Sequence, residues 1–168
     1  MLHIRLLESS DAAQYQALRL RGLMTNPEAF GSTYEREVDF TLAFVEERLK
    51  PVEGKFTLGA FDAEGQLVGI VTFVRESSAK ISHKGNVYGM YTAPEVRGQG
   101  AGRALLLALI DRARGCSGLE QINLAVITDN APARRLYQSL GFITYGTEQR
   151  ALKYEEQYWD EDYMVFRL

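Results

Sequence analysis

The chain has 168 residues, of which 46% are apolar and 24% are charged, and its formal net charge is −3. This length suits a single domain, residues 1–168, with one sizeable core. The slightly acidic balance gives no electrostatic case for a nucleic-acid partner or an anionic membrane surface, and no apolar run is long enough to span a bilayer.

The N-terminal residues alternate like a strand and show no cleavable signal pattern, and the single cysteine, Cys116, cannot form an internal disulfide. These features favour the cytoplasm. His3, His83 and Cys116 have no metal-ligand spacing, so we predict no metal site. The sequence leaves the oligomeric state open, a homodimer included.

Apolar periodicity predicts the elements in chain order. The first half of the chain reads as a strand, a helix, a loop rich in Pro, Gly and Asn, a second helix and a β-hairpin. The expected ranges are residues 2–7, 12–24, 25–32, 41–49, 55–61 and 66–75.

A polar loop at 76–85 then precedes a strand, a glycine-rich turn and a long helix that ends at Arg114. A strand, a helix with Pro132 in its first turn, and two closing strands follow. The expected strands are 86–92 before the turn and 119–127, 142–145 and 163–168 after the long helix. The helix that contains Pro132 is expected at 131–140. The order β-α-α-β-β-β-α-β-α-β-β predicts an α/β fold with a mixed sheet and helices on both faces.

The turn before the long helix carries glycines at 98, 100 and 102. Unpaired backbone N–H groups lie there at the positive end of the helix dipole. Such a turn is an anion site, and phosphate is its usual occupant. Neither the P-loop nor the dinucleotide-binding spacing fits, since Arg103 and Ala104 follow Gly102. Taken alone, the motif also reads as a surface turn before a core helix.

Two motifs occur together in this strand–helix context, Arg97-x-x-Gly100-x-Gly102 and Asn130-x-x-Ala133-x-x-Leu136-Tyr137-x-x-Leu140-Gly141-Phe142. Together they resemble the GNAT superfamily of acyl-CoA-dependent N-acyltransferases. The resemblance covers nearly the whole chain and is weakest at residues 25–49 and 147–162. It implies a GNAT-like fold whose fourth and fifth strands splay apart, and acetyl-CoA as the co-substrate.

The resemblance also implies which residues bind the donor. The turn would hold the pyrophosphate of coenzyme A, and the preceding strand would pair with the pantetheine as with an added strand. Asn130 would contact the pantetheine arm, and Tyr137 would lie near the thioester sulfur. The other positions are Met90, Tyr91, Thr92, Arg97, Gly98, Gln99, Gly100, Ala101, Gly102 and Arg103.

Several of these residues have plainer readings. Arg97 and Arg103 are also typical of solvated surface charge, and Asn130 is typical of a helix N-cap. Tyr137 shares an apolar helix face with Ala133, Leu136 and Leu140, which is the pattern of core packing.

The reaction needs an acid and a base. The thiol of the leaving group has a pKa of about 8.5, so the departing thiolate benefits from a proton donor. A tyrosine has a pKa of about 10, so Tyr137 is protonated at neutral pH and suits the role of general acid. Many GNAT members carry a glutamate on the strand before the turn, but residues 87–91 contain no carboxylate. We therefore predict that the amine loses its proton through ordered water, helped by Glu35, which otherwise reads as an exposed charge.

By the same resemblance, residues 26–39 and 154–163 would line the acceptor cleft. Residues 151–162 hold five acids against one lysine, which suits a cationic amine but is also typical of a solvated face. The predicted function is acetyl transfer from acetyl-CoA to a primary amine, by direct attack in a ternary complex. The amine would be a small amine, an amino acid derivative or a peptide N-terminus. A non-catalytic acyl-CoA sensor and another nucleotide-binding domain are the alternatives.

Overall fold

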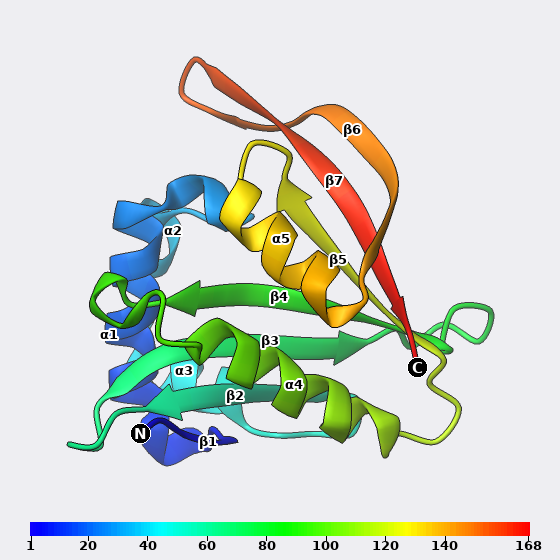
Figure 1. The fold of residues 1–168 in the computed structure, drawn as a ribbon. Coiled ribbons are helices and arrows are strands. Elements are labelled where there is room, and N and C mark those ends of the chain that lie inside the picture. Colours follow the sequence, from blue (N-terminus) through cyan, green and yellow to red (C-terminus); the bar gives the residue numbers. More distant parts are fainter.

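The computed structural model describes residues 1–168 and contains one seven-stranded sheet in the order β1-β2-β3-β4-β5-β7-β6 (Figure 1). β4 and β5 pair in parallel, and all other neighbours are antiparallel. The mixed sheet predicted from the sequence is therefore confirmed. The strands are β1 (His3–Leu6), β2 (Lys55–Phe61), β3 (Leu67–Arg75), β4 (Lys84–Thr92), β5 (Gln121–Ile127), β6 (Ile143–Tyr154) and β7 (Gln157–Arg167).

Helices cover both faces of the sheet, as predicted (Figure 1). α4 (Ala101–Arg114) and α5 (Ala131–Leu140) lie on one face; α1 (Ala12–Thr25), α2 (Tyr34–Glu37) and α3 (Leu42–Leu49) lie on the other. The apolar run of α4 is the centre of the core, where Leu105, Leu106 and Leu109 are completely buried. No helix of the chain has the length and apolarity needed to cross a membrane.

β4 and β5 stay together for only three residue pairs, Lys84–Gln121, Gly85–Ile122 and Asn86–Asn123. Beyond these pairs the two strands diverge toward the ends of their arrows (Figure 1). The predicted splay is confirmed, and it leaves the backbone edge of β4 without a partner strand on this side.

β4 also contains a bulge where it diverges from β5. Tyr88 pairs with Thr72 and Tyr91 with Ile70, so Gly89 and Met90 together lie opposite one residue of β3. Gly89 has a φ of 58°, in the left-handed region that glycine enters without a Cβ clash. The bulge therefore changes the course of β4 next to the opening between the strands.

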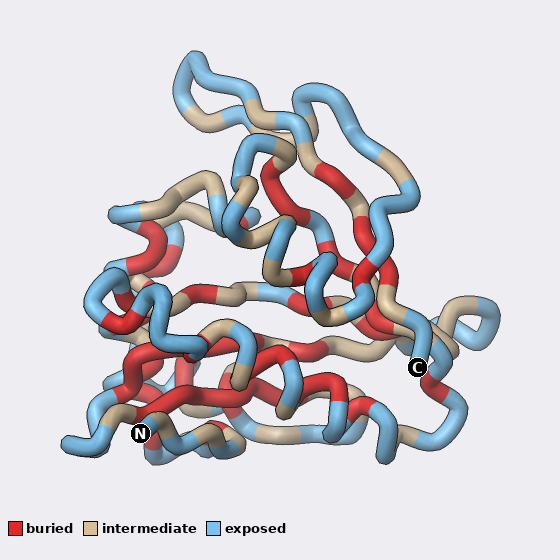
Figure 2. Tube along the Cα trace, in the orientation of Figure 1, coloured by how far each residue is buried: buried red, intermediate tan, exposed pale blue.

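The C-terminal hairpin is longer than the sequence predicts. The predicted closing strands at 142–145 and 163–168 are wrong in extent, because β6 and β7 take in nearly all the residues between them. Most of β6 is exposed, so its side chains show no apolar alternation that would indicate a strand (Figure 2). A break in register between Glu148 and Leu152 disturbs the period further. The buried apolar side chains of the hairpin come from β7, where Met164 and Val165 belong to the core.

Candidate functional site

A cavity of about 1240 Å³ occupies the opening between β4 and β5. α1, α2, α3, β2, the turn before α4, α5 and β7 also contribute to its walls, so it joins segments from both ends of the chain. A cavity of this size accepts a cofactor-sized ligand. Every position predicted to bind the donor lines it except Gln99: these are Met90, Tyr91, Thr92, Arg97, Gly98, Gly100, Ala101, Gly102, Arg103, Asn130 and Tyr137.

The glycine turn presents open backbone to this cavity. Gly98 and Gly100 have φ values of 78° and 83°, and no atom lies within 4 Å of where a Cβ would stand on either. Gly100 is the N-cap of α4 and supplies no side-chain acceptor. The first amides of this 14-residue helix are thus uncapped by any side chain and carry the positive end of its dipole. The turn has the properties of an anion site.

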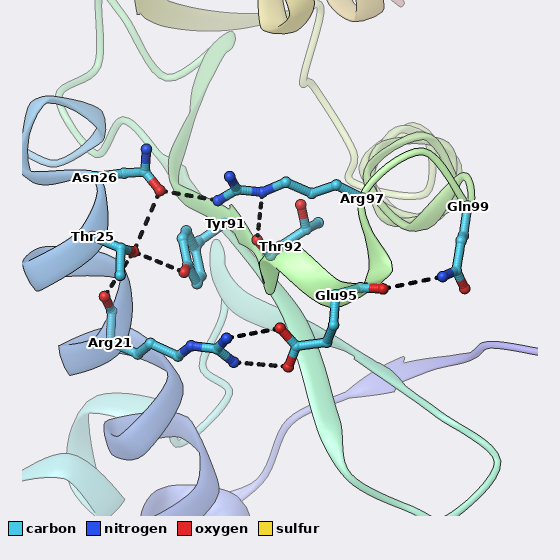
Figure 3. Close-up of polar contacts among 8 residues, drawn as sticks. All are labelled: Arg21, Thr25, Asn26, Tyr91, Thr92, Glu95, Arg97 and Gln99. Atoms are coloured by element: carbon cyan, nitrogen blue, oxygen red, sulfur yellow. Dashed lines mark hydrogen bonds and ion pairs between the residues drawn. The ribbon is translucent and has the colours of Figure 1, made fainter.

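The side chain of Arg97 connects the turn to the end of β4 and to the end of α1 (Figure 3). Its Nε donates to the carbonyl of Thr92 at 3.2 Å, and its Nη2 donates to Oδ1 of Asn26 at 3.0 Å. The guanidinium also lies 5.6 Å from the centre of the Tyr91 ring. Arg97 is exposed, as the surface-charge reading expects, and its side chain also joins the turn to the end of α1.

Other side chains reinforce the same junction (Figure 3). Gln99 donates from Nε2 to the carbonyl of Glu95 at 3.1 Å, which explains why its side chain does not line the cavity. Arg21 forms a bidentate ion pair with Glu95, in which Nη1 and Nη2 donate to the two carboxylate oxygens at 2.8 and 2.7 Å. The Tyr91 hydroxyl hydrogen-bonds that of Thr25 at 3.0 Å. Together these contacts position the backbone of the turn.

Asn130 and Arg103 act at the ends of α5 and α4. Oδ1 of Asn130 accepts a hydrogen bond from the Ala133 N–H at 3.2 Å, which is the N-cap expected from the sequence. Capping uses only the oxygen, so the amide nitrogen of Asn130 stays available in the cavity wall. Arg103 donates from Nη1 to Ser139 at 3.1 Å and joins the two helices.

Tyr137 is both a core residue and part of the cavity wall. It is 7% exposed and meets Phe142 edge-on, with ring centres 5.8 Å apart. Burial raises the pKa of its hydroxyl to about 12. The hydroxyl therefore remains protonated over the whole physiological range.

The predicted base Glu35 and a second carboxylate, Glu161, differ in their position relative to the cavity. Glu35 is exposed on α2, accepts a hydrogen bond from the Tyr154 hydroxyl at 3.3 Å, and does not line the cavity. Glu161 on β7 does line it, and burial, followed by repulsion from Glu148, raises the pKa of Glu161. Tyr163 lies on the same face of β7 and donates a hydrogen bond to Glu148. Sequence reasoning counted Glu161 among the acids of 151–162 but gave it no role.

The cavity also has a basic wall, formed by Arg19, Arg36, Arg48 and Lys55, that the sequence analysis missed. Arg19 donates from Nε and Nη2 to the two carboxylate oxygens of Glu37 at 2.6 and 2.9 Å, and Arg48 donates to one of them at 2.8 Å. Burial alone would raise the pKa of Glu37, but hydrogen bonds led by that from Arg19 outweigh it and hold the pKa at about 2. A charged residue on the buried face of the first helix was the available signal.

Comparison with known proteins gives a consistent result. Residues 21–142 match the model of a family described as the Acetyltransferase (GNAT) family. Mycothiol acetyltransferase from Brachybacterium faecium is 30% identical over 149 residues, which are 84% of this chain and 40% of that protein. The chain thus spans about two fifths of the length of this curated relative.

Solved structures resemble the chain over its full length. The acetyltransferase of the GNAT family from Streptococcus pneumoniae has a TM-score of 0.87 and 28% identity, and the match covers 100% of both chains. The structure of yncA from Salmonella typhimurium with its cofactor acetyl-CoA has a TM-score of 0.82 and 23% identity, covering 100% of this chain and 94% of that one. At that identity, the second likeness concerns the fold alone.

Proposed function

The chain belongs to the GNAT acetyltransferase family, and on that premise we propose that it transfers an acetyl group from acetyl-CoA to a primary amine by direct attack in a ternary complex. The observation that carries the proposal is the single cavity that joins an open glycine turn, an unpaired strand edge and Tyr137. The only thiol, Cys116, lies outside this cavity, so the chain offers no cysteine to carry the acetyl group.

The donor would lie along β4 and end at the turn. The Gln99 amide already donates to the Val96 carbonyl at 3.2 Å. The other amides of residues 98–103 would bind the pyrophosphate, which requires close approach to backbone that glycine permits. The pantetheine would pair with Met90, Tyr91 and Thr92 along the edge that β5 leaves free, in the manner of an added strand. One lone pair of the Thr92 carbonyl is already used by Arg97, which leaves the other for the ligand.

Tyr137 would assist departure of the thiolate. Its pKa of about 12 lies well above the value of about 8.5 for a free thiol. Complete proton transfer to the sulfur is therefore uphill, whereas a hydrogen bond to the developing negative charge is favourable. We propose that the hydroxyl stabilises the leaving sulfur by that hydrogen bond, and that the thiolate takes its proton from solvent water as it leaves.

The proton of the amine would leave through ordered water toward a carboxylate. Glu35 stays a prediction for this role, but its place outside the cavity favours Glu161. A carboxylate with a raised pKa is the better base, because its pKa lies closer to neutral pH. Glu161 also brings negative charge to the wall that would receive the ammonium form of the acceptor.

The test measures free thiol released from acetyl-CoA in the presence of a panel of primary amines, together with thermal stabilisation by coenzyme A. We expect stabilisation by coenzyme A, about 2.7 kcal/mol at a concentration 100 times its dissociation constant, and amine-dependent thiol release. Stabilisation without release for any amine would favour an acyl-CoA sensor. Stabilisation by NAD or ATP in place of coenzyme A would overturn both readings.

A further inference from the structure

The basic wall of the cavity stands out in a chain whose net charge is −3. It is made by cations from four separate elements, namely Arg19, Arg36, Arg48 and Lys55. Glu37 can balance only one of the two guanidinium charges that it contacts. Arg36 and Lys55 make no ion pair within the chain. The wall therefore carries uncompensated positive charge into the cavity.

Arg19 brings this charge deepest into the molecule. The residue is 7% exposed, and Glu37 accepts hydrogen bonds from its Nε and Nη2 only. Nη1 lies 3.1 Å from where a Cβ on Gly89 would stand, beside the β4 bulge and in the cavity wall, and is bonded to no acid. Tyr15 is the other polar neighbour of the guanidinium. A buried donor of this kind gains most from an anionic acceptor.

This wall is separate from the glycine turn. Lys55 pairs with Val74, and Val74 pairs with Asn86, so Lys55 lies level with the start of β4. The turn follows the other end of β4, six residues and about 20 Å further along. An anion held by the turn would therefore lie beyond the reach of Lys55.

The two sites also lie on opposite faces of the sheet. Phe56 faces α4, whose Arg112 lies 5.2 Å from the centre of its ring. Lys55 and Thr57 alternate with Phe56 along β2 and so face the other way, toward α1 and α3. Thr57 and its neighbour Thr72, joined hydroxyl to hydroxyl at 2.8 Å, add polar groups to this floor of the cavity.

We propose that the basic wall binds a carboxylate of the acceptor, so that the acceptor is a free α-amino acid rather than a simple amine or a peptide N-terminus. The inference rests on the proposed acetyl transfer and narrows its substrate class. A guanidinium fork matches a carboxylate in shape and charge.

Matched acceptors test the proposal directly. L-Leucine is compared with 3-methylbutylamine, which lacks the carboxylate, and with L-leucinamide, which neutralises it; L-phenylalanine, 2-phenylethylamine and L-phenylalaninamide form a second set. We expect kcat/KM for the acids to exceed that for both analogues by about 10-fold or more, because a site built for a charged group rejects molecules without it. Equal or faster acetylation of the amines and amides overturns the proposal.

A variant locates the subsite. Lys55→Met keeps the length of the side chain and leaves the Glu37 cluster intact, so the fold is preserved. It should raise KM for L-leucine about 10-fold while leaving KM for acetyl-CoA and for 3-methylbutylamine unchanged. Lys84→Met, on β4 but outside the cavity wall, is the control and should change none of them. If Lys55→Met leaves the preference for L-leucine intact, this wall does not bind the carboxylate.

Failure of the acetyl-transfer proposal is distinguishable from failure of this one. If no acceptor releases thiol, titration calorimetry of L-leucine and of 3-methylbutylamine into the protein saturated with coenzyme A decides the matter. Binding of L-leucine that Lys55→Met weakens supports the carboxylate subsite without catalysis. Absence of L-leucine binding, or equal binding of the amine, overturns it.

Discussion

The donor end of the cavity consists mainly of backbone, whereas the acceptor end consists of side chains. At the turn, Gly98 and Gly100 leave the backbone open to the cavity, and side chains such as Arg97 only hold that backbone in place. At the other end, charged side chains from α1, α2, α3, β2 and β7 line one cavity although they are far apart in the sequence. A backbone site of this kind accepts one shape of anion, while a side-chain site can change its ligand by single substitutions.

The largest effect should come from the buried ion cluster that supports the acceptor end. Glu37→Gln leaves Arg19 and Arg48 without their shared carboxylate, and breaking a buried pair in this way costs about 3–5 kcal/mol of unfolding free energy. Urea denaturation measures the loss. Glu95→Gln, which removes the exposed partner of Arg21, is the control and should leave the midpoint nearly unchanged.

The same cluster predicts a pH dependence. Because the folded state lowers the pKa of Glu37 to about 2, its stabilisation is fully present above the unfolded pKa of about 4.3 and is lost as the pH falls toward 2. Urea midpoints of the wild type should decline over that window more steeply than those of Glu37→Gln. Parallel declines would show that other groups control the acid limb.

The donor end is tested by a pair of glycine substitutions with equal backbone strain. Gly100→Val should reduce coenzyme A affinity about 100-fold or more, because a branched side chain would occupy the space of the pyrophosphate. Gly65 has a φ of 81°, near the 83° of Gly100, and is likewise open, but it lies in the β2–β3 turn outside the cavity. Gly65→Val should bind coenzyme A normally. Equal affinities of the two variants would mean that the turn is not the donor site.

Between the two ends, Tyr137→Phe removes one hydroxyl and keeps the ring that packs on Phe142. Turnover should fall about 10- to 100-fold, since a hydrogen bond to the leaving sulfur is lost, while acetyl-CoA affinity should scarcely change. Steady-state rates and calorimetry separate the two quantities. A variant with wild-type turnover would reduce Tyr137 to a packing residue.

The smallest effect should distinguish the two carboxylates proposed as the base. Glu161→Gln should lower kcat/KM about 10-fold and flatten the acid limb of its pH profile, because this carboxylate lines the cavity. Glu35→Gln should lose only the contact with Tyr154 and keep its pH profile. The reverse pattern would restore Glu35 as the better candidate.

The difference between the two ends also explains what could be predicted from the sequence. The glycine turn and the Asn130 cap are local patterns, so their residues and spacing identify them directly. Arg19 and Arg48 come to share Glu37 only through the packing of three helices, which no local pattern records. The place of Glu161 depended on recognising β7, whose partner strand carries mostly exposed side chains. Strand pairing between distant segments was the missing information.

The most direct test of the account varies acetyl-CoA and L-leucine together and measures the initial rate of thiol release. Direct attack requires both substrates to occupy the cavity at once, since the only cysteine lies outside it. We predict double-reciprocal lines that intersect, with no release in the absence of the amine. Parallel lines would indicate an acetylated enzyme, and release independent of the amine would indicate hydrolysis; either result would contradict transfer within a ternary complex.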